Sequence, residues 1–151
     1  MTGRLNLHSL LILTLVCFLL GAAPITAASP VHRVSGGGTA TLSQVAMGVS
    51  IDGTLASGSF ECLMAGRSKF ALAPFGLSHI MAVHASPTEG SLSGSVARFA
   101  GPARLVMDNG QSLDVHVHVW VDGPTQQFQL TVDEIGTIPT ETLLTGHITV
   151  R

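Results

Sequence analysis

The chain has 151 residues, a formal net charge of −2 and 46% hydrophobic residues. Seven Lys and Arg residues stand against nine Asp and Glu residues, and no stretch gathers the basic residues into the patch that nucleic-acid binding requires. The composition therefore disfavours a nucleic-acid-binding protein. Glycine and threonine are abundant but are spread among apolar runs, which argues against a disordered chain.

The first 28 residues have the three-part pattern of a secretory signal peptide. Arg4 supplies the positive start, Leu10–Leu20 is an uncharged apolar run, and the small residues of Gly21–Ser29 follow it. The apolar run is too short for a spanning helix, which needs about 20 apolar residues. We expect cleavage after Ala27 or Ala28, a secreted protein, and a mature chain without a membrane anchor. An uncleaved N-terminal anchor is the open alternative.

The mature part is predicted to be one all-β domain, an antiparallel barrel or sandwich of about eight strands. Helical periodicity of useful length is absent, and short β-rich runs recur between Gly, Pro, Asn and Asp residues at the spacing typical of these folds. Residues 29–35 are expected to form a flexible lead, and residues 36–151 the domain. The expected strands are Thr39–Ile51, Thr54–Met64, Leu77–His84, Ser91–Phe99, Ala103–Met107, Gln111–Val121, Gln126–Val132 and Thr142–Val150.

Two turns predict a three-stranded meander from Ala103 to Val132. Asp108–Gly110 offers residues that tolerate the positive φ of a tight hairpin, and Asp122–Pro124 forms the second turn. Alternating apolar residues then predict the buried rows of the strands. These rows are Val115, Val117, Val119 and Val121, then Phe128, Leu130 and Val132, then Leu144, Ile148 and Val150.

Cysteine usage excludes an intramolecular disulfide, because Cys17 leaves with the signal peptide and Cys62 remains alone. Phe60, Cys62 and Met64 share one face at period two, so Cys62 is expected to be a small buried hydrophobe. In the alternative, Cys62 or the edge strands join chains into a homo-oligomer.

The stretch DVHVHVWVD at Asp114–Asp122 is the strongest candidate for chemistry. His116 and His118 stand two apart, so a strand places both on one face, about 6–7 Å apart along it. Two imidazoles can bind one metal ion, and zinc, iron or manganese would need a further ligand. The candidates for that ligand are Asp114, Asp122, His79, His84 and His147. The alternative is that both histidines are the solvent face of an ordinary strand, and in that case no cofactor is needed.

The spacing Gly110-x5-His116-x-His118 resembles the opening of the first motif of the cupin family, metal-binding β-barrels. The resemblance ends at Asp122, where cupins have a glutamate, and it implies a metal-dependent enzyme that uses the two histidines. The dipeptide at residues 133–134, which follows a predicted strand, is interpreted as a solvated turn.

Trp120 shares the face of His116 and His118. It either packs under the segment Phe70–Leu77 or forms a platform for a sugar or another flat ligand. The apolar segment Phe70–Met81 could close a pocket, and Trp120 and Phe75 are the candidate ligand-contacting residues.

Three segments resemble a family of uncharacterised secreted bacterial β-proteins: Gly36–Ala40, Phe60–Gly66 and Pro139–Ile148. The resemblance implies secretion and a β-fold, with no assigned activity and no functional residues to carry over. We therefore expect a non-catalytic extracellular protein that binds a small or extended ligand or has a structural or interaction role. The alternative is the metal-dependent cupin-like enzyme.

Overall fold

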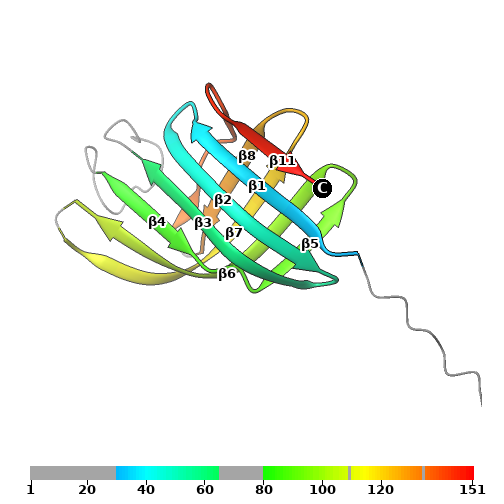
Figure 1. Cartoon of the computed structure of the whole chain (residues 1–151). Coiled ribbons are helices and arrows are strands. Elements are labelled where there is room, and N and C mark those ends of the chain that lie inside the picture. Colours follow the sequence, from blue (N-terminus) through cyan, green and yellow to red (C-terminus); the bar gives the residue numbers. More distant parts are fainter. Residues whose placement is uncertain (1–29, 65–79, 109, 134) are drawn as a thin grey trace, which may run out of the picture.

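The computed structural model describes residues 30–64, 80–108, 110–133 and 135–151, and their regular structure is entirely β-strand (Figure 1). One antiparallel sheet contains all the strands, which confirms the predicted all-β antiparallel class. No apolar helix of membrane-spanning length occurs in these ranges. The strands are β1 His32–Thr39, β2 Ser43–Asp52, β3 Leu55–Met64, β4 Met81–Ala85, β5 Glu89–Ser93, β6 Val96–Met107, β7 Ser112–Asp122, β8 Gln127–Val132, β9 Gly136–Thr137, β10 Glu141–Thr142 and β11 His147–Val150.

The sheet is strongly rolled, so that β1, β2 and β3 lie in front of β6, β7 and β8 (Figure 1). Its strand order is β10-β8-β7-β6-β4-β3-β2-β1-β11, with β5 pairing β3 and β6, and β9 pairing β8. Two contacts connect the strands at the two ends of the sheet. Ala40 bridges Leu143 beside β10, and the Gln126 side chain bonds the backbone of Ile148 in β11.

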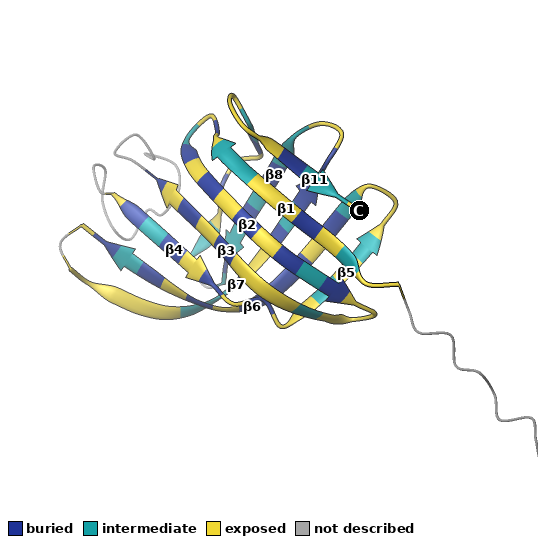
Figure 2. Cartoon of the chain, viewed as in Figure 1, coloured by how far each residue is buried: buried dark blue, intermediate teal, exposed yellow. Residues whose placement is uncertain are grey.

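The core lies between the front and back of the rolled sheet. Along β2, β4 and β8, for example, buried apolar residues alternate with more exposed residues (Figure 2). Phe60 of β3 is central to it. Its ring centroid lies 5.8 Å from that of Phe99 in β6 and 6.5 Å from that of Phe128 in β8, both in edge-to-face geometry. Phe60, Cys62 and Met64 are all buried, as the period-two pattern predicts.

The predicted meander is present as β6, β7 and β8. Gly110 adopts a positive φ of 82° in the first turn, where the Met107 N–H donates to the Gln111 carbonyl over 2.8 Å. In the second turn the positive φ falls on Gln126, at 57°. The predicted core rows of β7 and β8 are buried from Val117 to Val121 and from Phe128 to Val132, and Val115 is half-buried.

The glycine-rich segment lies in the first strand of the sheet. Strand β1 starts at His32, inside the expected lead, and pairs with β2 on one side and β11 on the other. Gly36 has a φ of +135°, and a Cβ atom there would lie 1.9 Å from the His147 carbonyl oxygen. The neighbouring backbone thus approaches too closely for a side chain, which explains why glycine occupies this position.

Several expected strands have other bounds. The run Ser91–Phe99 divides at Gly94, whose φ of +61° forms a turn between β5 and β6, and β6 continues through Pro102 to Met107. The run Thr142–Val150 is interrupted before β11, and Leu144 is 65% exposed, so its predicted core position is wrong.

The first and third expected strands also start elsewhere. The chain turns at residues 40–42, so β2 begins at Ser43. Strand β4 spans Met81–Ala85, and the first three residues expected there, 77–79, lie outside the described residues.

Candidate functional site

The outer face of β5, β6, β7 and β8 carries the polar residues of DVHVHVWVD. Val117, Val119 and Val121 point into the core, so period-two alternation turns His116, His118 and Trp120 outward. This arrangement agrees with the faces that the sequence predicts.

Cross-strand pairing sets two rows of side chains across this outer face. In the first row, Trp120 pairs with Arg98 of β6 and Gln129 of β8, and Arg98 pairs in turn with Ser91 of β5. In the second row, His118 pairs with Ala100 and Thr131, and Ala100 pairs with Glu89. Side chains opposite each other on one face lie about 4.5–5.5 Å apart at Cβ, so the residues of each row are neighbours across the face.

A groove of about 350 Å³ lies over these rows. Ala100 has the outward orientation of its strand neighbours Arg98 and Pro102, yet it is only 8% exposed. A small side chain between the larger ones of Glu89 and His118 therefore lowers the floor of the groove. The groove is lined by Thr54, Glu89, Gly90, Ser91, Arg98, Phe99, Ala100, His118, Val119, Trp120, Gln129 and Thr131.

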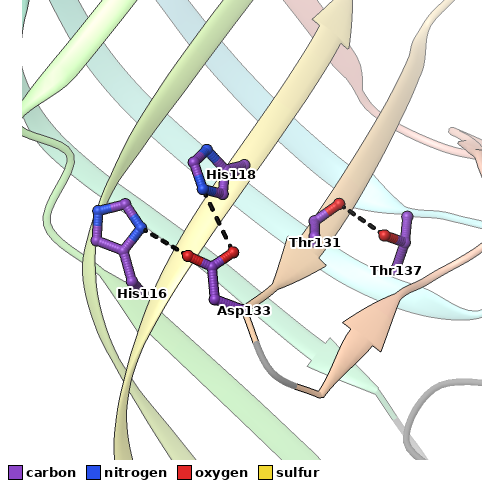
Figure 3. Close-up of polar contacts among 5 residues, drawn as sticks. All are labelled: His116, His118, Thr131, Asp133 and Thr137. Carbon is purple, nitrogen blue, oxygen red and sulfur yellow. Dashed lines mark hydrogen bonds and ion pairs between the residues drawn. The ribbon is translucent and has the colours of Figure 1, made fainter.

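His116 and His118 converge on Asp133, the residue after β8 (Figure 3). The Asp133 Oδ2 atom lies 3.3 Å from His116 Nδ1, and Oδ1 lies 3.3 Å from His118 Nε2. The two imidazole centroids are 5.1 Å apart. The side chains are 43%, 57% and 43% exposed for His116, His118 and Asp133. We call these three residues the His-His-Asp cluster; because His118 also lines the groove, the cluster adjoins it.

The other histidine candidates lie elsewhere. His84 Nδ1 of β4 lies 3.6 Å from Glu61 Oε1 of β3, on a different part of the sheet. His147 is on β11, opposite Gly37 of β1. Neither joins the His-His-Asp cluster, which is the group with metal-binding spacing in the described residues. His79 and Phe75 lie outside the described residues, as does the segment expected to pack over Trp120.

Of the two aspartates considered as further ligands, neither reaches the histidine pair. Asp114 is exposed and lies opposite Arg104 in the β6–β7 register. The Asp122 carboxylate accepts a hydrogen bond from Thr125 Oγ1 over 2.8 Å within the second turn.

Asp133 is the site residue that the sequence reasoning assigned to a solvated turn. The register of the β7–β8 hairpin is the signal that locates Asp133, because Asp122 pairs with Gln127 and Val117 with Val132. Continuing that register by one residue places Asp133 opposite His116. The Asp133 N–H indeed donates to the His116 carbonyl over 2.9 Å.

A second cluster of titratable groups is buried. The Glu141 carboxylate is fully buried and accepts hydrogen bonds from the Leu42 N–H over 2.8 Å and the Ser43 hydroxyl over 2.9 Å. Burial raises the pKa of the neighbouring Cys62 thiol to about 12; the hydrogen bond with Ser43 lowers it and the Glu141 charge raises it. Cys62 is 1% exposed, which supports its structural interpretation and leaves its sulfur inaccessible to another chain.

No protein-family model, no curated protein and no solved structure matches the chain. The resemblances to secreted bacterial β-proteins and to cupins therefore remain expectations from short motifs.

Proposed function

We propose that this protein is a secreted, non-catalytic ligand-binding domain, and that its groove over β5–β8 binds a glycan. The observation that carries the proposal is the position of Trp120, a half-buried aromatic residue in the polar outer face of the sheet, within a groove of about 350 Å³. Ligand sites for small molecules have volumes of about 300–1,000 Å³. The signal-peptide pattern at the N-terminus supports secretion.

The groups around Trp120 suit a ligand with many hydroxyl groups. Arg98 supplies N–H donors, Glu89 supplies carboxylate acceptors, and Gln129 supplies both. The flat indole offers an apolar surface for one face of a sugar ring, and the surrounding polar groups bind the hydroxyls at its edge. A groove with one aromatic platform and mixed donors and acceptors matches this chemistry better than that of a purely apolar ligand.

Arg98 is available to a ligand. In the described part of the chain it has no carboxylate at ion-pair distance, and its side chain is exposed. A guanidinium without a protein partner can form paired hydrogen bonds with vicinal hydroxyls or with an acidic sugar.

The interior is a less suitable place for a ligand. Phe60 packs edge to face against Phe99 and against Phe128 between the two sides of the rolled sheet, within the cluster of buried apolar residues. A ligand there would have to displace close-packed side chains. The outer groove needs no such rearrangement.

Trp120 is the single tryptophan of the chain, so intrinsic tryptophan fluorescence reports on the groove alone. We would titrate the purified protein with soluble neutral and acidic oligosaccharides. A saturable change in the intensity or wavelength of Trp120 emission is expected with at least one of them. A panel that leaves the emission unchanged would contradict the assignment of a glycan ligand.

Arg98→Ala and Arg104→Ala provide a matched pair for this titration. Both arginines are exposed on the outer face of β6, but Arg104 lies outside the groove and donates to Ser112. Loss of the Arg98 hydrogen bonds should weaken oligosaccharide binding by about tenfold or more, since a bond with a charged group contributes about 1.5–3 kcal/mol. Arg104→Ala should bind as the wild type does. Equal affinities of the two variants would remove Arg98 from the site.

The second candidate function is a metal-dependent enzyme. It is favoured by Asp133, which adds a carboxylate to the pair His116 and His118 and so provides the two-histidine, one-carboxylate set used by several catalytic metals. Turnover of a substrate only in the metal-loaded protein would favour this candidate over the non-catalytic one.

A further inference from the structure

We propose that His116, His118 and Asp133 form a binding site for one divalent transition-metal ion, with zinc as the best fit, at the border of the groove. The metal site stands on the His-His-Asp cluster alone. Its role as an anchor for a ligand oxygen rests on the proposed function.

The fold holds all three ligands on one face of two neighbouring strands (Figure 3). His116 and His118 are two residues apart on β7, and the β7–β8 register places Asp133 beside them. The imidazole nitrogens and the carboxylate oxygen that could bind an ion all lie within 4.8 Å of one another. A zinc ion with bonds of about 2.0 Å separates tetrahedral ligands by about 3.3 Å, so modest side-chain rotations complete the site. Half-exposed side chains can make those rotations freely.

The contacts within the cluster leave room for an ion. His116 Nδ1 and His118 Nε2 each lie 3.3 Å from an Asp133 carboxylate oxygen. This distance is longer than the 2.7–2.9 Å of a strong charge-assisted hydrogen bond. Two imidazoles and one carboxylate form a donor set for zinc or iron rather than for calcium or magnesium, which take oxygen ligands.

Three protein ligands leave at least one coordination position of a zinc ion open. His118 lines the groove and lies beside Trp120 along the outer face of β7. An oxygen atom of a ligand in the groove can therefore take the open position. The metal would orient the ligand, while Trp120 and Arg98 contact the rest of it.

The test is zinc binding to the purified protein, measured by isothermal titration calorimetry after chelation and exchange into metal-free buffer. The wild type should bind one zinc ion per chain, and Asp133→Asn and His118→Ala should each weaken binding by at least about tenfold. His84→Ala is the matched control, because His84 also pairs with a carboxylate, that of Glu61, but no second histidine joins this pair among the described residues. It should bind zinc as the wild type does. Far-UV circular dichroism and thermal unfolding would verify that each variant is folded.

Cobalt substitution provides an independent readout. Cobalt(II) bound by two imidazoles and a carboxylate absorbs visible light, and the paramagnetic ion should quench Trp120 because both lie on the outer face of β7. Quenching lost in Asp133→Asn would support the site. Absence of stoichiometric zinc binding, or zinc binding retained in a folded Asp133→Asn variant, would overturn it.

The metal site and the proposed function can fail separately. Zinc binding without any oligosaccharide response would retain the site and reject the glycan-binding function. An oligosaccharide response that is unchanged by chelation in a zinc-binding protein would retain both and reject the anchoring role. Weaker oligosaccharide binding after chelation supports the whole proposal.

Discussion

The backbone N–H of Asp133 donates to the carbonyl of His116 over 2.9 Å, and the same pairing places the Asp133 carboxylate 3.3 Å from the His116 imidazole. The backbone bond orders the segment, and the carboxylate is left half-exposed beside two half-exposed histidines. The backbone pairing of β7 with the residue after β8 therefore does not depend on the contact between the Asp133 carboxylate and the His116 imidazole. Fold and site can therefore be perturbed separately at this position.

We predict that Asp133→Asn changes the free energy of unfolding by less than about 1 kcal/mol, because exposed ion pairs contribute little in water. Urea denaturation of the metal-free protein would measure this. A loss of several kcal/mol would mean that the carboxylate stabilises the end of β8, and metal binding would then have to be tested with the histidine variants instead.

Substitution of Gly36 in β1 should reduce the stability of the protein far more than substitution of Gly48 in β2. A Cβ atom at Gly36 would lie 1.9 Å from the His147 carbonyl oxygen, whereas one at Gly48 meets nothing within 4 Å. Gly36→Ala is therefore expected to cost about 3 kcal/mol or more, or to prevent folding. Gly48→Ala should change stability by less than about 1 kcal/mol. Chemical denaturation of the two variants compares them directly, and similar stabilities would contradict the close packing of β1 against β11.

Gln126 should contribute to stability through its side chain in spite of its backbone conformation. Its Oε1 atom accepts from the Ile148 N–H over 2.7 Å and its Nε2 atom donates to the Ile148 carbonyl over 2.9 Å. Gln126→Ala should cost about 1–3 kcal/mol, since it leaves part-buried backbone groups without these partners. Amide hydrogen exchange at Ile148 should accelerate in the variant.

Gln126→Gly separates the effect of the lost side-chain hydrogen bonds from the effect of the positive φ. The variant also lacks the side chain, but it relieves the positive φ of 57° and should be about 1 kcal/mol more stable than Gln126→Ala. If both variants matched the wild type in stability and in exchange at Ile148, Gln126 would have no part in tying the sheet ends together.

The stability of the protein should decrease between about pH 9 and pH 12 because of Cys62. Burial raises the pKa of the folded thiol from 9.0 to about 12, so the folded chain retains a proton that the unfolded chain releases in this range. The contribution is fully present below pH 9 and is lost progressively as pH rises toward 12. Urea denaturation across this range, compared with Cys62→Ala, should give a steeper decrease for the wild type.

Thiol alkylation provides the complementary measurement. At a given pH below 9, a pKa of about 12 leaves about a thousandfold less thiolate than a pKa of 9.0. Peptide mass spectrometry should therefore find Cys62 unmodified in the native protein and modified in urea. Rapid alkylation of the native protein would show that the buried thiol is accessible.

Most of the local structure of the meander could be predicted from the sequence, whereas the groove could not. Alternation in Asp114–Asp122 assigns His116, His118 and Trp120 to one face because successive side chains of a strand point in opposite directions. The register of a hairpin follows from its turn, so Asp133 could have been placed opposite His116 by counting from Asp122. It was assigned to a turn because acidic pairs after strands are usually solvated.

The sequence by itself determined the all-β class, the β6–β7–β8 meander and the faces of the β7 and β8 residues, because these depend on local alternation and turn chemistry. The β5–β6 hairpin, which brings Ser91 and Glu89 beside Arg98 and Ala100, is local, but its turn at Gly94 lies inside a run that the alternation predicts as one strand. Only the tertiary structure decided that the glycine-rich β1 pairs with β11. Pairing between distant segments depends on the burial and backbone hydrogen bonding of the whole sheet, and many partners satisfy the same alternating pattern. The groove around Trp120 combines both kinds of pairing: β5 to β8 follow one another as hairpins, and Thr54, distant in the sequence, lies beside β5, where its carbonyl accepts from the Gly90 N–H.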